Sequence, residues 1–322
     1  MRLLKLVPDN TNIGFVRLRY WAFGLTAFLT LAAIGLVGWH GLNFGVDFKG
    51  GVLIEARFVT APNLDQVRSE VDHLGVGEAS LQTFGAPNVV SIRLPMPKST
   101  DEGATNRLVK SVQDDLVKHY PGLTFNKADT VSPKVSGELM RNGLLAVFLA
   151  VFGIAIFSWL RYEWQFGVST FVAVAHDLLM TLGFFAVTGF EFDLNIVAAV
   201  LTVIGYSIND KIVIDDRIRE NMRKYRSMDM RALIDLSVNE TLPRTVMTSL
   251  TILLALFALL FLGGHVLRGF TAAMILGIFV GTYSSIYVSS SLLITLGLRA
   301  NPDAPDKPER GTSGAERVGP KG

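Results

Sequence analysis

The chain has 322 residues, half of them apolar, and a positive mean hydropathy of +0.39. Soluble domains of this length rarely carry so much apolar side chain, so the composition is typical of a polytopic membrane protein. A net charge of only +2 excludes the strongly basic surface that binds nucleic acids, and the lack of cysteine excludes disulfides, thiolate metal sites and a cysteine nucleophile.

Six stretches of the chain are long and apolar enough to cross a membrane. A spanning helix needs about 20 mostly apolar residues to cross a hydrocarbon core roughly 30 Å thick. The first stretch, residues 20–40, is longer than the roughly 7–15 apolar residues of a signal peptide, and we expect it to be a retained anchor. The other five lie in residues 138–298, at 142–160, 164–190, 194–214, 245–262 and 269–298.

Loop charges predict the orientation of these helices. Lys and Arg are concentrated in residues 1–19, in residues 215–243 and after residue 298, whereas the two opposite short loops contain only Arg268. Positive residues in short loops favour the cytoplasm. The sequence therefore predicts a multi-pass protein with both termini in the cytoplasm and with its large hydrophilic insert on the other side of the membrane.

The insert, residues 45–137, has the pattern of a small α+β domain. Apolar residues recur with strand or helix spacing in the order β-α-β-β-α-β, which is the ferredoxin-like order. The expected elements are strands at 52–59, 80–84, 89–94 and 123–125, and helices at 64–74 and 108–116. This order predicts a sheet with one face covered by helices and one face open. Residues 299–322, rich in Pro, Gly and charge, are predicted to be disordered.

Three ionisable residues fall inside the predicted spans: Asp177, Asp210 and Arg244. Such groups cost free energy in a bilayer, so a functional role is the first interpretation. Structural alternatives remain open at each position. Asp177 could hold two helices together by hydrogen bonds, Asp210 could pair with Lys211 or cap a helix end, and Arg244 could only reach toward the cytoplasmic interface.

Small residues in the last span predict close helix packing. Gly277 and Gly281 have the spacing that lets two helix backbones approach, and Ser284 and Ser285 extend this face of small side chains, called here the thin side. The pattern does not say whether the packed helix belongs to this chain or to another subunit. No cofactor is expected, because no cluster of ligand residues accompanies His176 and residues 48–51 lack the spacing of a phosphate-binding loop.

Four motifs appear in order along the chain: Phe44-Gly45-Val46-Asp47-Phe48-Lys49-Gly50-Gly51, Ala175-His176-Asp177, Gly205-Tyr206-Ser207-Ile208-Asn209-Asp210, and Arg244-Thr245 with Thr248-Ser249. Together they resemble the SecF proteins of the SecD/SecF family, which are bacterial protein-export membrane proteins. The resemblance extends over residues 10–298, nearly the whole chain.

This resemblance implies one half of a transporter of the resistance-nodulation-division superfamily, with six transmembrane helices and a periplasmic domain between the first two. It implies a place in the bacterial inner membrane, a heterodimer with SecD, and contact with the SecYEG translocon, YajC and a translocating preprotein. The implied activity is not enzymatic: the proton motive force would assist protein translocation.

Residue roles follow from the same resemblance. It assigns the proton relay to Asp210 and Arg244, with Asn209 and Asp177 beside them. The junction between helix and domain is predicted from composition instead: Gly45, Gly50 and Gly51 surround Asp47 and Phe48, and glycine permits backbone changes that other residues resist.

Two positions depart from the pattern of the family. Lys211 stands where Thr or Ser is usual, and Asp215 stands where an uncharged residue is expected. An ammonium beside Asp210 would favour the charged form of that carboxylate. Two other functions remain possible from the helices alone: half of an exporter of small molecules or lipids, and a passive scaffold of the translocon.

Overall fold

The computed structural model describes residues 7–8, 11–77, 79–97, 103–263 and 267–299. Of the tail predicted to be disordered, residues 300–322 lie outside the described residues, as do residues 1–6 and 9–10 of the N-terminal segment.

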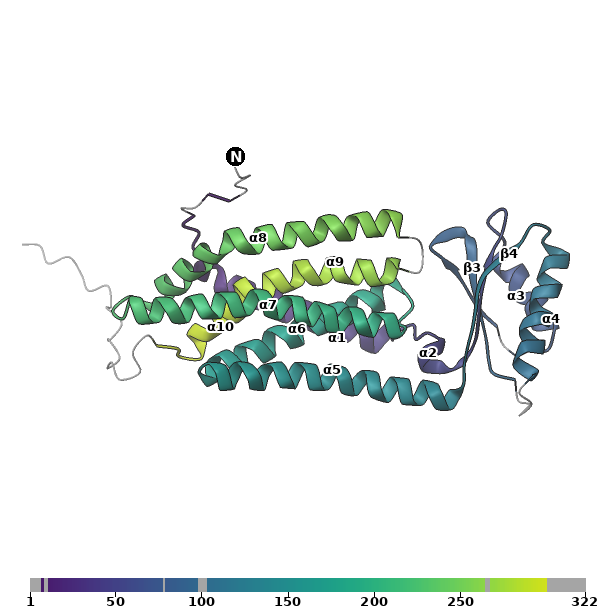
Figure 1. Cartoon of the computed structure of the whole chain (residues 1–322), viewed down its shortest axis with the longest axis horizontal. Coiled ribbons are helices and arrows are strands. Elements are labelled where there is room, and N and C mark those ends of the chain that lie inside the picture. Colours follow the sequence, from purple (N-terminus) through teal and green to yellow (C-terminus); the bar gives the residue numbers. More distant parts are fainter. Residues whose placement is uncertain (1–6, 9–10, 78, 98–102, 264–266, 300–322) are drawn as a thin grey trace, which may run out of the picture.

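Six helical segments in the described part of the chain are long and apolar enough to cross a membrane, which confirms the predicted number. They are α1 Arg19–His40 after the 3-10 turn η1 Val16–Leu18, α5 Pro133–Arg161, α6 Trp164–Thr188, α7 Leu194–Lys224, α8 Met230–Leu262, and α9 Arg268–Tyr283 continued by the π-helix η2 Ser284–Ser289 and by α10 Ser290–Thr295. Figure 1 shows them side by side in one elongated bundle.

The helices divide into a central and a peripheral set. About half of each apolar window is buried in α6, α7 and the last segment, whereas less than a fifth is buried in α1, α5 and α8. Apolar side chains on the outside of the bundle are compatible with lipid contact. Helices α7 and α8 run well past the predicted spans, because the charged residues 215–224 and the mixed polar and apolar residues 230–244 continue them as helix.

The insert folds in the predicted order β-α-β-β-α-β. Its elements are β1 Gly51–Arg57, α3 Leu64–His73, β2 Ser80–Phe84, β3 Ala86–Leu94, α4 Ala104–His119 and β4 Thr124–Val131. The sheet has the order β2-β3-β1-β4 and every neighbouring pair is antiparallel. Val52, Ile54, Val90 and Ile92 point from the sheet to α3 and α4 and form a separate core.

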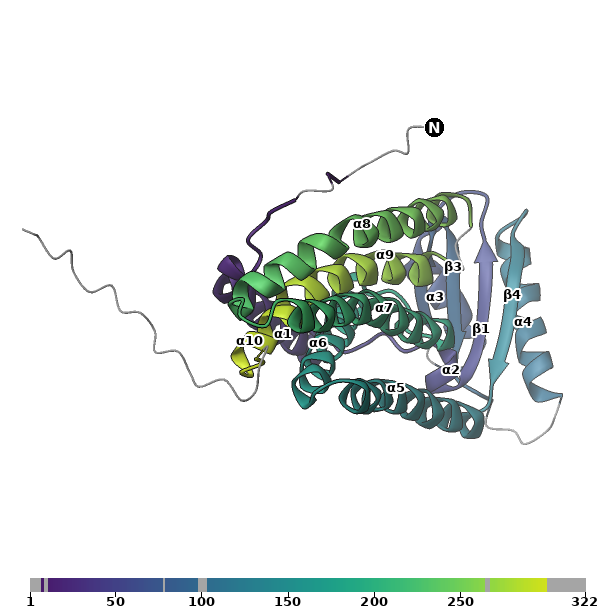
Figure 2. The same ribbon diagram turned by 60° about the vertical axis from the view of Figure 1, so that its left-hand side comes forward.

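The other face of the sheet is turned toward the ends of the membrane-spanning helices (Figures 1 and 2). The expectation that this face is open is therefore wrong in part. Leu53 and Glu55 are buried on it, and a cavity of about 510 Å³ separates it from the loop between α6 and α7. The α6–α7 loop reaches the sheet because α6 ends at Gly189, where the backbone turns with φ of 66°.

At its C-terminal end the domain continues directly into helix α5, without a linker. Strand β4 ends at Val131, Ser132 caps the next helix by accepting from the Val135 N–H, and Pro133 is the first residue of α5. The domain therefore ends about one helical turn before the predicted boundary at residue 137.

Candidate functional site in the helices and at the domain junction

Asp210 lies on the buried side of α7 that faces α8. Its side chain is 6% exposed, and its Oδ1 accepts a hydrogen bond of 2.5 Å from the Thr245 hydroxyl. Its Oδ2 is buried and has no hydrogen-bond partner in the described part of the chain. The carboxylate thus has one oxygen in a hydrogen bond and one oxygen without a partner, and the second oxygen can take up and release a proton.

Arg244 and Asn209, which the resemblance places in the relay, do not contact Asp210 as ion-pair or hydrogen-bond partners among the described residues. Both side chains are exposed. Each is one residue away from a member of the Asp210–Thr245 pair, and successive residues of a helix point about 100° apart. The hydroxyl of Thr245 therefore makes the direct contact with Asp210, while the guanidinium of Arg244 interacts with this carboxylate electrostatically without a hydrogen bond.

Asp177 lies at the meeting point of α6, α7 and η2 and is fully buried. Its Oδ2 accepts hydrogen bonds from Ser207 at 2.5 Å and from Ser284 at 2.9 Å, and its Oδ1 is 3.1 Å from His176 Nδ1. Two serine hydroxyls and an imidazole thus hold this carboxylate in place. The contacts support the structural alternative for Asp177, and they are separate from the Asp210–Thr245 pair.

Lys211 does not turn toward Asp210. Its ammonium is 2.7 Å from Asp215 Oδ2 and 3.1 Å from the Ser169 hydroxyl, and both charged side chains are almost fully buried. The two departures from the family pattern are therefore partners of one another. The expected effect of Lys211 on the charge of Asp210 is offset, because Asp215 neutralises the ammonium on the next turn of α7.

The thin side of the last span packs against α7 of the same chain. A side chain at Gly277 would collide with Val203, and a Cβ at Gly281 would lie 2.9 Å from the Ser207 Cβ. Beyond Gly281 the helix widens into η2, where Ser285 donates to the Ser207 carbonyl and Ser284 reaches Asp177. The close-packed partner that the sequence left undecided is therefore α7.

The junction motif forms a short helix, α2 Val46–Lys49, that is docked on the bundle. The Gly45 N–H donates to the Phe192 carbonyl, and the Phe192 N–H donates to Asn43, so the segment pairs with the α6–α7 loop. Phe48 packs with Phe44 and Phe192 in one aromatic cluster. A Cβ at Gly45 would lie 2.6 Å from Glu191 Oε1 and 3.3 Å from the Asp193 Cβ, so a side chain here would displace the Glu191 carboxylate.

Asp47 connects the motif to the helix that carries Asp210. Its Oδ2 accepts a hydrogen bond of 2.9 Å from the Leu194 N–H, the first residue of α7. Asp193 accepts from the Ile196 N–H of the same helix end. Two carboxylates therefore satisfy free amide groups at the positive end of the α7 dipole.

Gly50 and Gly51 let the chain turn from α2 into the sheet. Their φ angles are 71° and 127°, which side chains rarely adopt. A Cβ at Gly50 would lie 3.2 Å from the Pro133 Cα, and one at Gly51 would lie 2.5 Å from the Leu94 carbonyl. The two glycines therefore hold the first strand against both the start of α5 and the end of β3.

An ion pair that the sequence did not indicate links sheet and bundle. Arg93 of β3 lies 2.6 Å from Glu191 of the α6–α7 loop, and it also donates to Asn43 and to the Phe44 carbonyl. Burial raises the pKa of Glu191, although the Arg93 guanidinium opposes this. Sequence patterns could not reveal this contact, because the two residues are far apart in the chain and neither belongs to a motif.

Comparisons with known proteins find the same family over most of the chain. The family described as protein export membrane protein SecD/SecF, C-terminal, matches residues 111–299, and the SecD/SecF GG motif matches residues 40–62. The protein translocase subunit SecF of Cereibacter sphaeroides is 43% identical over 307 residues, which cover 92% of this chain and 93% of that protein. The SecF subunit of Rickettsia felis is 38% identical over 291 residues, 90% of this chain and 94% of its own.

Two solved structures have a similar fold. The crystal structure of SecDF from Thermus thermophilus, a translocon-associated membrane protein, matches with a TM-score of 0.82 and 37% identity. SecDF in its super-membrane-facing form matches with a TM-score of 0.67 at the same identity. Each match covers 90% of this chain and 39% of the SecDF chain, so this chain spans well under half the length of that protein.

Proposed function

The chain belongs to the SecD/SecF family of protein-export membrane proteins, as a multi-pass protein of the SecF type, and on this premise we propose that it is the SecF half of a proton-driven complex that assists protein translocation. We take its partner to be a SecD-type chain, because SecDF holds a fold like this one in 39% of its own length. The single block of six spanning helices in the described residues supports the need for such a partner.

The observation that carries the proposal is the buried carboxylate of Asp210 with one free oxygen. A charged carboxylate at membrane depth is costly, so its two protonation states favour different surroundings. In the neutral form, Asp210 is compatible with the Thr245 hydroxyl that it contacts here. In the charged form it would attract the neighbouring Arg244, and a shift of α8 would exchange one partner for the other.

Helix α7 is the element that would carry such a change to the exported domain. Asp210 lies 16 residues beyond Leu194, a distance of about 24 Å at 1.5 Å per residue. At the Leu194 end, the helix is bonded to Asp47 of the junction motif. A movement of α7 would therefore act directly on the segment that enters the sheet.

The proposed setting is the bacterial inner membrane, with both termini cytoplasmic and the β-α-β-β-α-β domain in the periplasm near the SecYEG translocon, YajC and the translocating preprotein. The loop charges support this orientation. Cysteine at Lys118, which is exposed on α4, should react with an impermeant thiol reagent added outside intact cells, and cysteine at Ser227 should react only after permeabilisation. The reverse pattern would disprove the orientation.

The central test is Asp210→Asn, which retains the size and the contact to Thr245 but cannot ionise. In vesicles containing the SecD-type partner and the translocon, we expect this variant to lose at least about tenfold of the translocation that depends on a proton gradient. Its folding and its co-purification with the partner should be unchanged. The matched control is Asp114→Asn, the same change at an exposed position of α4.

Two alternatives have distinct outcomes in this experiment. If Asp210→Asn retained full gradient-dependent translocation, a passive scaffold would be supported. If the variant no longer bound its partner, Asp210 would have a structural role, which also supports a scaffold. An exporter of small molecules or lipids would not co-purify with a translocon. Gradient-driven release of a lipophilic dye without any effect on preproteins would support that reading.

A further inference from the structure

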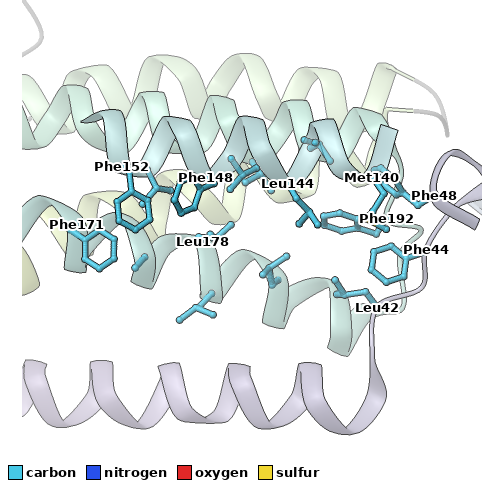
Figure 3. Close-up of a pocket in the computed structure, with 18 residues that line it drawn as sticks. Leu42, Phe44, Phe48, Met140, Leu144, Phe148, Phe152, Phe171, Leu178 and Phe192 are labelled. Carbon is cyan, nitrogen blue, oxygen red and sulfur yellow. The ribbon is translucent and has the colours of Figure 1, made fainter. Parts of the chain in front are cut away.

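A cavity of about 710 Å³ lies along the outside of the bundle between α5 and α6 (Figure 3). Its walls are Met140, Leu144 and Phe148 of α5 and Ala175 and Leu178 of α6, among 18 lining residues that are all apolar or glycine. An extended peptide segment needs partners for its backbone amides and carbonyls, and these apolar side chains offer none. The chemistry of the cavity therefore fits a hydrocarbon chain.

The length and depth of the cavity fit one leaflet of a bilayer. On α5 it extends from Met140 to Phe152, which is 12 residues or about 18 Å along the helix. This is a little over half of the roughly 30 Å hydrocarbon core. The Phe152 and Phe171 rings, 5.3 Å apart, come together from α5 and α6 at the inner end. The cavity thus ends where a single acyl chain would end.

The outer end of the cavity lies at the junction motif. Phe44, Phe48 and Phe192 line this end, and Figure 3 shows their rings grouped beside Met140. Lys49 and Arg141 directly follow the lining residues Phe48 and Met140, and both are exposed. Long cationic side chains at this depth can reach a lipid phosphate near the outer end of the cavity.

The cavity is open to the surroundings of the bundle. Leu144 and Phe148 are 65% and 54% exposed although they belong to a membrane-spanning helix. Helices α1 and α5 both pack on α6, and the cavity lies on the α5 side of it. A lipid of the surrounding membrane can therefore enter sideways without any opening of the bundle.

We propose that the α5–α6 cavity binds one acyl chain of a membrane phospholipid from the leaflet next to the β-α-β-β-α-β domain. The lipid then packs directly on Phe44 and Phe48, so its occupancy stabilises the docked position of the junction motif. This site is separate from Asp210, which lies on the opposite side of α7 against α8. It is a ligand site, and it adds no step to proton transfer.

The test uses the full chain in complex with its SecD-type partner, in vesicles of phosphatidylethanolamine and phosphatidylglycerol. A trace of phosphatidylglycerol carries a diazirine on one acyl chain. After illumination, mass spectrometry of peptides should locate most adducts on residues 143–152 and 171–182. Ala175→Phe fills the cavity from α6 and should lower these adducts about tenfold. Val147→Phe fills it from α5 and should act in the same way.

The control is Ala255→Phe, the same substitution at an exposed position of α8, which should leave the adducts unchanged. Three results would overturn the proposal. Adducts could be spread evenly over the exposed faces of α1, α5 and α8; both cavity-filling variants could retain full labelling; or labelling could occur in the single chain and vanish in the complex, which would mean that a partner helix occupies the cavity.

Discussion

Neighbouring side chains on α7 contact different helices, because successive side chains point about 100° apart around the helix axis. Ser207 contacts Asp177 of α6, Asp210 contacts Thr245 of α8, and Lys211 reaches Ser169 of α6 and its own partner Asp215. Of the alternatives left open for Asp210, a pair with the adjacent Lys211 is therefore not formed, because Lys211 pairs with Asp215. The two unusual residues of this chain are best understood as one buried ion pair, four residues apart.

Breaking this pair should be costly, and replacing it should not. Lys211→Met or Asp215→Leu alone leaves one buried charge without its partner, so we expect a loss of about 3–5 kcal/mol in the free energy of unfolding. The double variant Lys211→Met/Asp215→Leu should recover most of this loss. Denaturant unfolding in detergent measures both. A double variant as unstable as the single ones would contradict the ion-pair explanation.

At the scale of elements, α7 connects the two sites of the molecule. Its first residue is bonded to Asp47 of the junction motif, its middle carries Asp210, and η2 packs on it through serine hydroxyls. A π-helix places an extra residue in one turn and is frequent at functional sites. In this chain it brings Ser284 and Ser285 to Asp177 and to the Ser207 carbonyl.

The Asp47 cap can be tested by comparing two substitutions. Asp47→Asn retains an oxygen that accepts from Leu194, whereas Asp47→Ala removes it, so Asp47→Ala should lower the free energy of unfolding by about 0.5–2 kcal/mol and Asp47→Asn by less. Lys49→Ala, in the same short helix but exposed, is the control. Hydrogen exchange of the first turn of α7 should increase in Asp47→Ala only. Equal exchange in all three would show that Asp47 does not cap the helix.

At the scale of the whole molecule, domain and bundle meet through polar contacts around a cavity. Arg93 pairs with Glu191, Asn43 bonds to Gln82 and to the Gly189 carbonyl, and Arg268 donates to the Gly85 carbonyl. Glu55, Asp193, Lys127 and Arg268 line the cavity itself. An interface that buries so many charges responds to pH and can separate more easily than an apolar one.

The direction of the pH response follows from the carboxyl groups at this interface. Burial is the main cause that raises the pKa of Glu191, Glu55 and Asp193 above their ordinary values. A raised pKa means that the docked arrangement binds protons more tightly than a separated one, so docking strengthens as the pH falls through the raised pKa values. The gain is complete below the ordinary values of 4.5 for Glu and 3.8 for Asp.

Spin labels at Lys118 on α4 and at Thr188 at the end of α6, both exposed, measure this docking. We expect the separated fraction to grow as the pH is raised from about 4 to about 8, and the growth to be smaller in Glu191→Gln, whose side chain does not titrate. If separation increased on acidification, loss of the Arg93–Glu191 pair would outweigh the relief of burial, and the prediction would be wrong.

Local patterns in the sequence determined the number of spanning helices and the order of the insert. Apolar length identified the six spans, and spacing identified all six elements of the domain, because both depend on residues close together in the chain. The motif also indicated where the chain turns sharply into the sheet, because Gly50 and Gly51 both have a positive φ that favours glycine; its role as a movable junction stays a prediction. These properties need no knowledge of a distant partner.

Only the tertiary structure decided which residues meet. It placed the Thr245 hydroxyl on Asp210, paired Lys211 with Asp215, turned the predicted open face of the sheet toward the bundle, and identified α7 as the partner of Gly277 and Gly281. Each of these depends on how a helix is rotated or where a domain docks. A step of one residue changes the direction of a side chain by about 100° and so changes the helix that it contacts. The hydrophobic pattern of a membrane-spanning helix is too uniform to specify how the helix is rotated.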